Sequence, residues 1–124
     1  MAQKIVLVVD DASSTTQLLK AMLEVEGYEI AMAENGREGL ALTRGIKPDL
    51  VILDVVMPEM DGYEVLQTLK GDPATKDIPV VMLTARRDDE AIQEGLDLGA
   101  ADYIPKPFEP DILIKKVQTI IQGL

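Results

Sequence analysis

Short apolar runs recur along the chain and end in polar residues. The first, Ile5–Val9, is apolar at every position and stops at two adjacent acids. Residues 50–53 and 78–83 form further apolar runs, which end at an acid and at a threonine. A strand that is apolar at every position is buried on both faces, as in a parallel sheet covered by helices. The pattern predicts buried parallel strands at these places, with shorter strands at residues 28–33 and 101–105.

The segments between these runs carry apolar residues at helical spacing. Leu18, Leu19, Met22 and Leu23 form one stripe after the candidate caps Ser13, Ser14, Thr15 and Thr16, and Gly27 ends that helix. Further helices are predicted over residues 37–44, 63–69, 88–98 and 109–122, the first of which Gly45 is expected to end. The helix at 88–98 is weak, because Gly95 lies inside it and few large apolar residues support it. Repeated βα units predict a three-layer α/β fold with right-handed crossovers, formed by residues 1–124 as a single domain.

Composition excludes several kinds of chemistry. The 124 residues include no cysteine and no histidine, which rules out disulfide scaffolds, thiol catalysis, imidazole base catalysis and Cys or His metal sites. A net charge of −10 opposes binding to nucleic acid or to an anionic membrane and suits a cation or a basic protein surface. An acidic surface that only keeps the protein soluble is the alternative. Because no apolar run reaches membrane-spanning length and no signal peptide is visible, we expect a cytoplasmic protein.

Polar residues gather where the predicted strands end. Asp10 and Asp11 follow the first strand, Asp54 the third, Thr84 the fourth and Lys106 the fifth. In open α/β sheets, sites form outside the carboxyl ends of the strands at the topological switch point. In the flavodoxin-like strand order 2-1-3-4-5, the first and third strands are neighbours. The acids are therefore expected to converge in one cleft.

Carboxylates in one cleft repel one another unless a cation is present. Mg²⁺ is the natural candidate, because it prefers oxygen ligands and needs neither His nor Cys. A carboxylate beside a metal can also act as a nucleophile and form an acyl phosphate, with Lys106 and Thr84 contacting the phosphoryl oxygens. The alternatives are that the acids only cap helices, that Lys106 is an ordinary surface lysine and that Thr84 is a β-branched strand residue.

The sequence resembles the receiver domain of bacterial two-component response regulators. The resemblance extends over nearly the whole chain. It rests on Asp10-Asp11 after an apolar strand, Leu53-Asp54 followed by Met57-Pro58 and Met60-Asp61-Gly62, Thr84-Ala85, and Gly99-Ala100 through Asp102-Tyr103 to Lys106-Pro107-Phe108. Each motif alone is weak, but their order and separations together are highly specific.

The resemblance implies a role for each site residue. Asp54 would be the phospho-acceptor, and Asp10, Asp11, Asp54 and the backbone carbonyl of Val56 would bind Mg²⁺, with Mn²⁺ as a substitute. Thr84 and Lys106 would contact the phosphoryl group, and Thr84 and Tyr103 would form a switch pair, with Tyr103 half-buried at rest. A cis peptide is implied at Lys106–Pro107.

The resemblance also implies partners and a mode of signalling. A sensor histidine kinase or a phosphotransfer protein would phosphorylate the chain, which would catalyse only its own modification and not act as an enzyme on metabolites. The surface of the fourth helix, fifth strand and fifth helix would then bind a downstream protein. Val56 has no side-chain group to position water, which favours a long-lived phosphoryl group, whereas Arg86 points either to the site or to solvent.

Other functions fit the residues less well. An aspartyl phosphatase places a second acid two residues after its nucleophile, where this chain has Val56. A flavin carrier needs aromatic residues around its ring, whereas this chain has no Trp, one Phe and three Tyr. An inactive interaction module would have lost the acceptor, an acid or the lysine, all of which are present.

Overall fold

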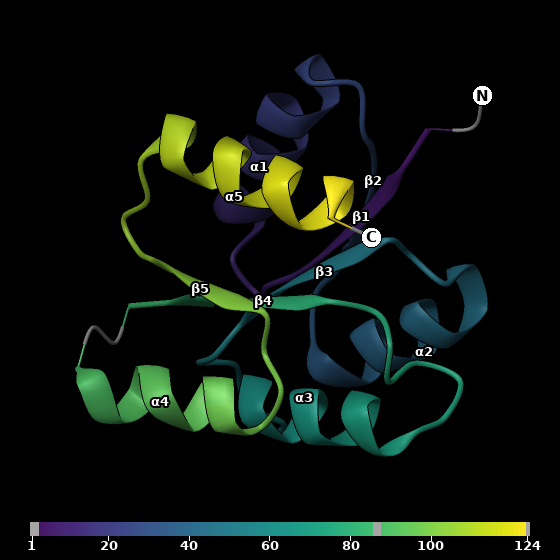
Figure 1. The fold of residues 1–124 in the computed structure, drawn as a ribbon, viewed down its shortest axis with the longest axis vertical. Helices are drawn as coiled ribbons and strands as arrows, with labels where there is room; N and C mark the ends of the chain where they lie inside the picture. Colours follow the sequence, from purple (N-terminus) through teal and green to yellow (C-terminus); the bar gives the residue numbers. More distant parts are fainter. Residues whose placement is uncertain (1–2, 86–87, 124) are drawn as a thin grey trace.

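A computed structural model describes residues 3–85 and 88–123, so Arg86 and Leu124 lie outside the described residues. Strands and helices alternate along the chain (Figure 1). The strands are β1 (Ile5–Val9), β2 (Glu29–Ala33), β3 (Leu50–Asp54), β4 (Val80–Thr84) and β5 (Asp102–Pro105). The helices are α1 (Ser13–Val25), α2 (Gly36–Ile46), α3 (Gly62–Gly71), α4 (Asp89–Asp97) and α5 (Pro110–Gln122).

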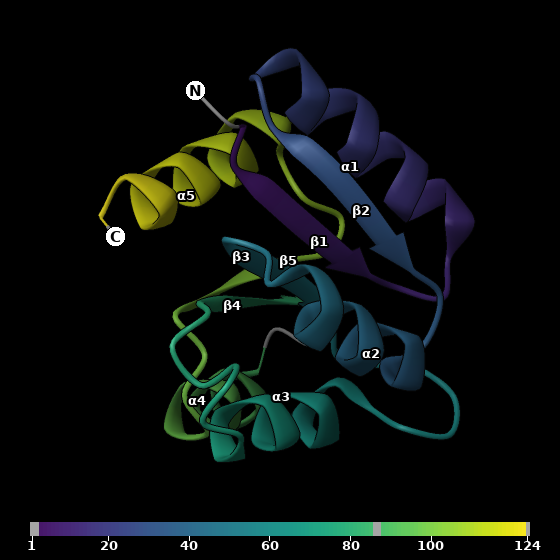
Figure 2. The same ribbon diagram turned by 90° about the vertical axis from the view of Figure 1, so that its right-hand side faces the viewer.

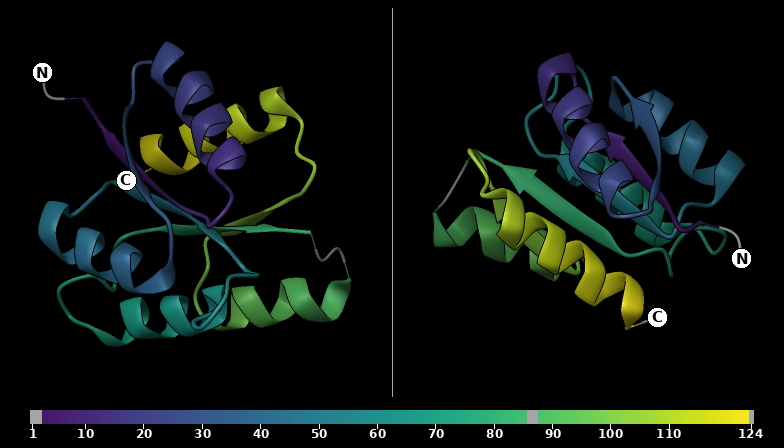
Figure 3. Two further views of the ribbon diagram at one scale, coloured as in Figure 1. Left: turned by 180° about the vertical axis from the view of Figure 1, so that it is seen from behind. Right: turned by 90° about the horizontal axis from the view of Figure 1, so that it is seen from above.

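The strands form one parallel sheet in the order β2-β1-β3-β4-β5, which confirms the predicted flavodoxin-like topology. Helices α1 and α5 cover one face, and α2, α3 and α4 cover the other (Figures 1 and 2). Figure 3 shows the same arrangement from behind and from above. The expected three layers are therefore present.

Each face of the sheet contributes to its own apolar core. Alternate residues of the buried strands point to opposite faces, so Val6 and Val8 pack with α1 and α5, while Leu7 and Val9 pack with α2 and α3. Strands β3 and β4 are buried along their whole length. The apolar runs in the sequence are therefore the strands covered on both faces.

The ends of several elements differ from the sequence-based expectation. The residue at the N-cap of α1 is Ala12, which makes no side-chain cap hydrogen bond, so the predicted Ser/Thr cap is wrong. Leu18 lies on the outer side of the predicted stripe and is 51% exposed. Helix α2 continues through Gly45 to Ile46 and ends where Lys47 takes a left-handed φ of 48° just before Pro48. Proline, and not glycine, sets that boundary.

The turn after β3 is fixed by close backbone packing. Gly62 begins α3, and its N–H donates to the Val55 carbonyl oxygen at 2.8 Å. Asp61 caps the helix through a capping box with Glu64. These contacts hold the loop that follows Asp54. Among the described helices, none is both long and apolar enough to cross a membrane.

We predict that Gly62→Ala lowers the free energy of unfolding by about 3 kcal/mol, because overpacking against rigid backbone cannot relax. A Cβ at this position would lie 2.3 Å from the Asp54 carbonyl oxygen. Gly45→Ala is the matched control, since nothing lies within 4 Å of its Cβ, and it should raise stability by up to about 1 kcal/mol. Urea unfolding of both variants checks this. Equal stability of the two would contradict the close approach.

Candidate functional site

Asp54 is the last residue of β3 and lies at the carboxyl edge of the sheet. Its side chain is only 5% exposed. The Val56 N–H donates to Asp54 Oδ1 at 3.4 Å, and Lys106 Nζ lies 3.3 Å from the same oxygen. The Val56 side chain points outward and is 63% exposed. Asp54 is therefore a buried carboxylate held by one amide and one ammonium.

Asp10 follows β1 directly beside this carboxylate. Its side chain is fully buried, and its Oδ2 accepts a hydrogen bond from Lys106 Nζ at 2.9 Å. Its other oxygen accepts the Ala12 N–H at 2.9 Å, which turns the chain into α1. One ammonium thus bridges two buried carboxylates, as the predicted convergence of the strand ends requires.

Asp11 completes the acidic cluster but is exposed. Asp10, Asp11 and Asp54 each offer a carboxylate oxygen, and these oxygens lie within 4.8 Å of one another. Such a set of hard oxygen donors, open on the Asp11 side, fits Mg²⁺, which takes one or a few carboxylates and retains water ligands. The contribution of the Val56 carbonyl to this site stays a prediction.

The carboxylates perturb one another strongly. Burial and, after it, the negative charge of Asp10 raise the pKa of Asp54 to about 6, against the opposing effect of Lys106 and the Val56 N–H. Burial lowers the pKa of Lys106, but its hydrogen bond to Asp10 and the charges of both acids outweigh this and leave it raised. One positive charge does not balance the cluster, so a further cation is favoured.

Thr84 lies at the end of β4 and is buried. Its carbonyl oxygen accepts the Lys106 N–H at 2.7 Å, which joins the ends of β4 and β5. The peptide bond between Lys106 and Pro107 is cis, as the resemblance implies. Thr84 and Lys106 thus lie at the same edge of the sheet as the acids.

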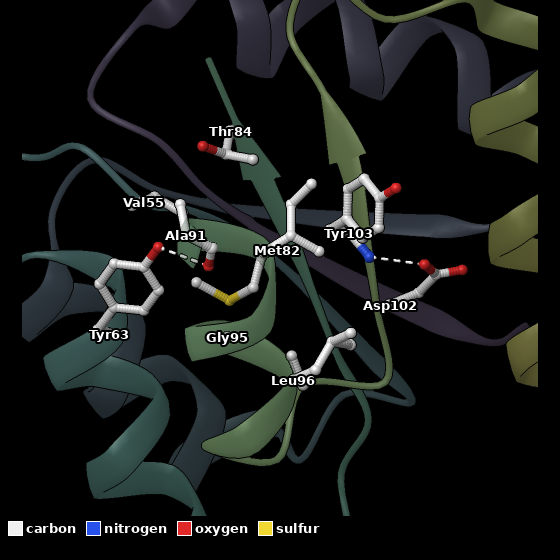
Figure 4. A pocket seen from close by; sticks show the side chains of 11 residues that line it. Val55, Tyr63, Met82, Thr84, Ala91, Gly95, Leu96, Asp102 and Tyr103 are labelled. Carbon is white, nitrogen blue, oxygen red and sulfur yellow. Dashed lines mark hydrogen bonds between the residues drawn. The ribbon is translucent and has the colours of Figure 1, made fainter. Parts of the chain in front are cut away.

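Tyr103 lies on β5 and is half-buried, as expected at rest. Lys116 of α5 donates to its carbonyl oxygen at 2.8 Å and pairs with Asp102 at 3.3 Å. The Lys116 Nζ also lies 4.8 Å from the centre of the Tyr103 ring, within reach of a cation–π interaction. Figure 4 shows the hydroxyl of Tyr103 pointing away from Thr84. The sequence analysis missed Lys116, because nothing local relates a helix lysine to a strand tyrosine.

Comparison with known proteins identifies the family. Residues 6–118 match the family model of the response regulator receiver domain. The chain is a response regulator receiver domain. Response regulator receiver domains are phosphorylatable signalling domains. The fold and the acidic cluster at the edge of the sheet agree with that role.

Relatives of this receiver differ in length. PilH of Pseudomonas aeruginosa is 37% identical over 118 residues, which cover 95% of this chain and 98% of PilH. The phosphate regulon transcriptional regulatory protein PhoB of the same species is 38% identical over 122 residues, which cover 98% of this chain and 53% of PhoB. The receiver thus spans about half the length of PhoB and of several other curated relatives.

Solved structures share the fold closely. A putative response regulator from Chloroflexus aurantiacus has a TM-score of 0.93 at 37% identity, and the match covers 98% of this chain and 99% of that one. The chemotaxis protein CheY4 of Vibrio cholerae has a TM-score of 0.90 at 38% identity, and the match covers 96% of this chain and 99% of that one.

Arg86, for which the sequence left two orientations open, lies outside the described residues.

We predict that Asp54→Asn stabilises the metal-free receiver by about 2 kcal/mol above pH 7. The pKa of Asp54 is about 6 when folded, above its usual value of about 4 when unfolded. The folded state therefore holds the Asp54 proton more tightly than the unfolded state does. The stability of the unmodified chain falls as pH rises from about 4 to about 6. Unfolding in EDTA at pH 4 and pH 8 tests this. A gain of equal size at both pH values would contradict the raised pKa.

We further predict that Lys106→Gln lowers the free energy of unfolding by about 2 kcal/mol at neutral pH without metal, because two buried carboxylates lose their counter-charge. Mg²⁺ should restore part of the loss. Lys4→Gln is the control, since Lys4 is 55% exposed and its pair with Asp49 spans 3.9 Å, and it should change stability by under about 1 kcal/mol. Thermal unfolding with EDTA and with Mg²⁺ distinguishes the two.

Proposed function

We propose that Asp54 is the phosphoryl acceptor of this receiver. The observation that carries the proposal is the placement of a buried carboxylate, with its side chain 5% exposed, beside a lysine and two further acids at one edge of the sheet. A carboxylate in such a setting can act as a nucleophile toward phosphorus. Asp11 is exposed, and both oxygens of buried Asp10 already accept hydrogen bonds, whereas the contacts of buried Asp54 with Lys106 and with the Val56 N–H both fall on Oδ1.

The reaction moves one phosphoryl group between two carriers. A carboxylate oxygen of Asp54 attacks the phosphorus of a phosphohistidine on a sensor histidine kinase or a phosphotransfer protein. The new O–P bond forms as the N–P bond breaks, and the imidazole nitrogen keeps the electron pair. The signal ends by hydrolysis. A water oxygen attacks the phosphorus, the O–P bond to Asp54 breaks, and the carboxylate is restored with release of phosphate. The chain thus catalyses only its own modification and its reversal.

Charge neutralisation makes this attack feasible. Asp10, Asp11 and Asp54 would hold Mg²⁺ together with the Val56 carbonyl. When bound, the ion offsets the negative charge of the acids and of the phosphoryl oxygens. Mn²⁺ accepts the same oxygen ligands and should substitute. Lys106 supplies a compact positive charge for a phosphoryl oxygen, and Thr84 supplies a hydroxyl donor from the end of β4.

The phosphoryl group is expected to change the packing near β5. It adds negative charge and acceptor oxygens at Asp54, which draw the Thr84 hydroxyl toward them. The space that Thr84 vacates lets Tyr103 rotate inward from the position where Lys116 now contacts it. This rotation would alter the surface formed by α4, β5 and α5, through which we expect the receiver to bind a downstream protein.

Charge also limits the partners. A net charge of −10 favours a partner with a basic surface and disfavours direct binding of this chain to nucleic acid or to an anionic membrane. We take residues 1–124 as a single receiver unit. We propose the cytoplasm as the compartment in which the receiver meets its phosphodonor.

We predict that acetyl phosphate with Mg²⁺ adds one phosphoryl group to the chain and that Asp54→Asn abolishes the gain. Asp77→Asn is the matched control, because Asp77 is an exposed acid before β4, at the opposite end of the sheet. Intact mass spectrometry with Mg²⁺, Mn²⁺ or EDTA measures the gain. Phosphorylation that persists in Asp54→Asn, or in EDTA, would overturn the assignment of the acceptor or of the metal.

A further inference from the structure

Helix α4 rests on the sheet through small residues. Its buried residues are Ala91 and Gly95, and neither belongs to the two apolar cores. Of its two larger apolar residues, Ile92 is half-buried and Leu96 is 39% exposed. Because little apolar area is buried, the hydrophobic effect holds this helix weakly, and other interactions carry more weight in fixing its position.

Tyr63 of α3 supplies such an interaction. Its hydroxyl donates to the Ala91 carbonyl oxygen at 3.0 Å, which links the neighbouring helices α3 and α4 (Figure 4). The Tyr63 ring also lies against α4, since a Cβ built on Gly95 would be 3.8 Å from Tyr63 Cε1. Helix α3 is itself fixed by its capping box and by buried Leu66. Tyr63 therefore ties α4 to a rigid neighbour.

The space enclosed below α4 is small. The cavity lined by Met82, Thr84, Gly95 and Tyr103, among others, has a volume of about 10 Å³. This is room for about one water molecule, far less than a phenol ring needs. Even with the space that Thr84 vacates, inward rotation of Tyr103 therefore requires α4 to move away. A hydrogen bond is lost once its atoms separate beyond about 3.5 Å, so even a small shift breaks the Tyr63 bond.

We propose that Tyr63 is a positioning residue that sets the threshold of the switch, by holding α4 over the cavity that Tyr103 must enter. The inference rests on the proposed switch role of Tyr103. Removing the hydroxyl frees α4 in the unphosphorylated receiver and lowers the work that phosphorylation must do. A ligand that favours the switched state should then bind more tightly, because its affinity and the conformational equilibrium are linked.

The test compares Tyr63→Phe, which deletes one oxygen, with the matched control Tyr28→Phe, whose ring packs in the core beside α1 and α5. Beryllofluoride with Mg²⁺ serves as the probe, as an analogue of the aspartyl phosphoryl group. Amide NMR follows α4 and Tyr103 during titration. Tyr63→Phe should bind beryllofluoride about five-fold more tightly than the unmodified chain, the size expected from one part-buried hydrogen bond. Tyr28→Phe should leave the affinity unchanged.

The outcomes separate the two proposals. If the unmodified chain does not bind beryllofluoride, the proposed function fails and the threshold role fails with it. If it binds without a shift at Tyr103, the proposed switch role of Tyr103 fails, and the threshold role with it, whereas Asp54 as acceptor stands. If the unmodified chain responds but Tyr63→Phe binds with the same affinity, the threshold role alone is overturned. A loss of thermal stability in Tyr63→Phe without a gain in affinity has the same meaning, since it shows a purely structural hydrogen bond.

Discussion

The ammonium of Lys106 between two buried carboxylates is the interaction on which the site depends. It lies 2.9 Å from Asp10 and 3.3 Å from Asp54, and it joins residues that are 96 positions apart in the sequence. Burying either acid without a counter-charge would cost several kcal/mol, so the ends of β1, β3 and β5 must meet for the fold to tolerate them. Yet one positive charge faces three acids once exposed Asp11 is included. The site is folded but short of positive charge, which is the condition that a divalent cation relieves.

Stability is distributed unevenly around this site. Strands β1, β3 and β4 are covered on both faces by two apolar cores, so the edge that carries the acids is rigid. The α4 side is different, because small residues and a tyrosine hydroxyl hold that helix in place of a large apolar contact. A charge change at the rigid edge therefore finds its easiest response in α4 and β5. On the proposed function, this contrast gives a physical reason for the switch to act through α4 and β5.

Much of this arrangement follows from local patterns in the sequence. The apolar runs place the strands, and the rule that sites form at the carboxyl ends of parallel strands brings Asp10, Asp54 and Lys106 together. The end of α2 did not follow, because Pro48 and the left-handed Lys47 outweigh the helix-breaking tendency of Gly45. The side-chain links made by Tyr63 and Lys116 could not be predicted either. They join elements that are adjacent only after folding, and no local pattern marks a tyrosine or a lysine as a long-range donor.

Strand β5 connects the chemistry to the outer surface over a very short distance. Lys106 follows the strand directly, and Tyr103 lies three residues earlier on it. On the proposed function, a phosphoryl group at Asp54 competes with Asp10 for the Lys106 ammonium, and that competition acts on the same strand whose outer end is held by Lys116. A four-residue strand with both ends tied cannot absorb such a change internally. The side chains of β5 and helix α4 must therefore shift instead. A change at Asp54 is in this way coupled through Lys106 to Tyr103.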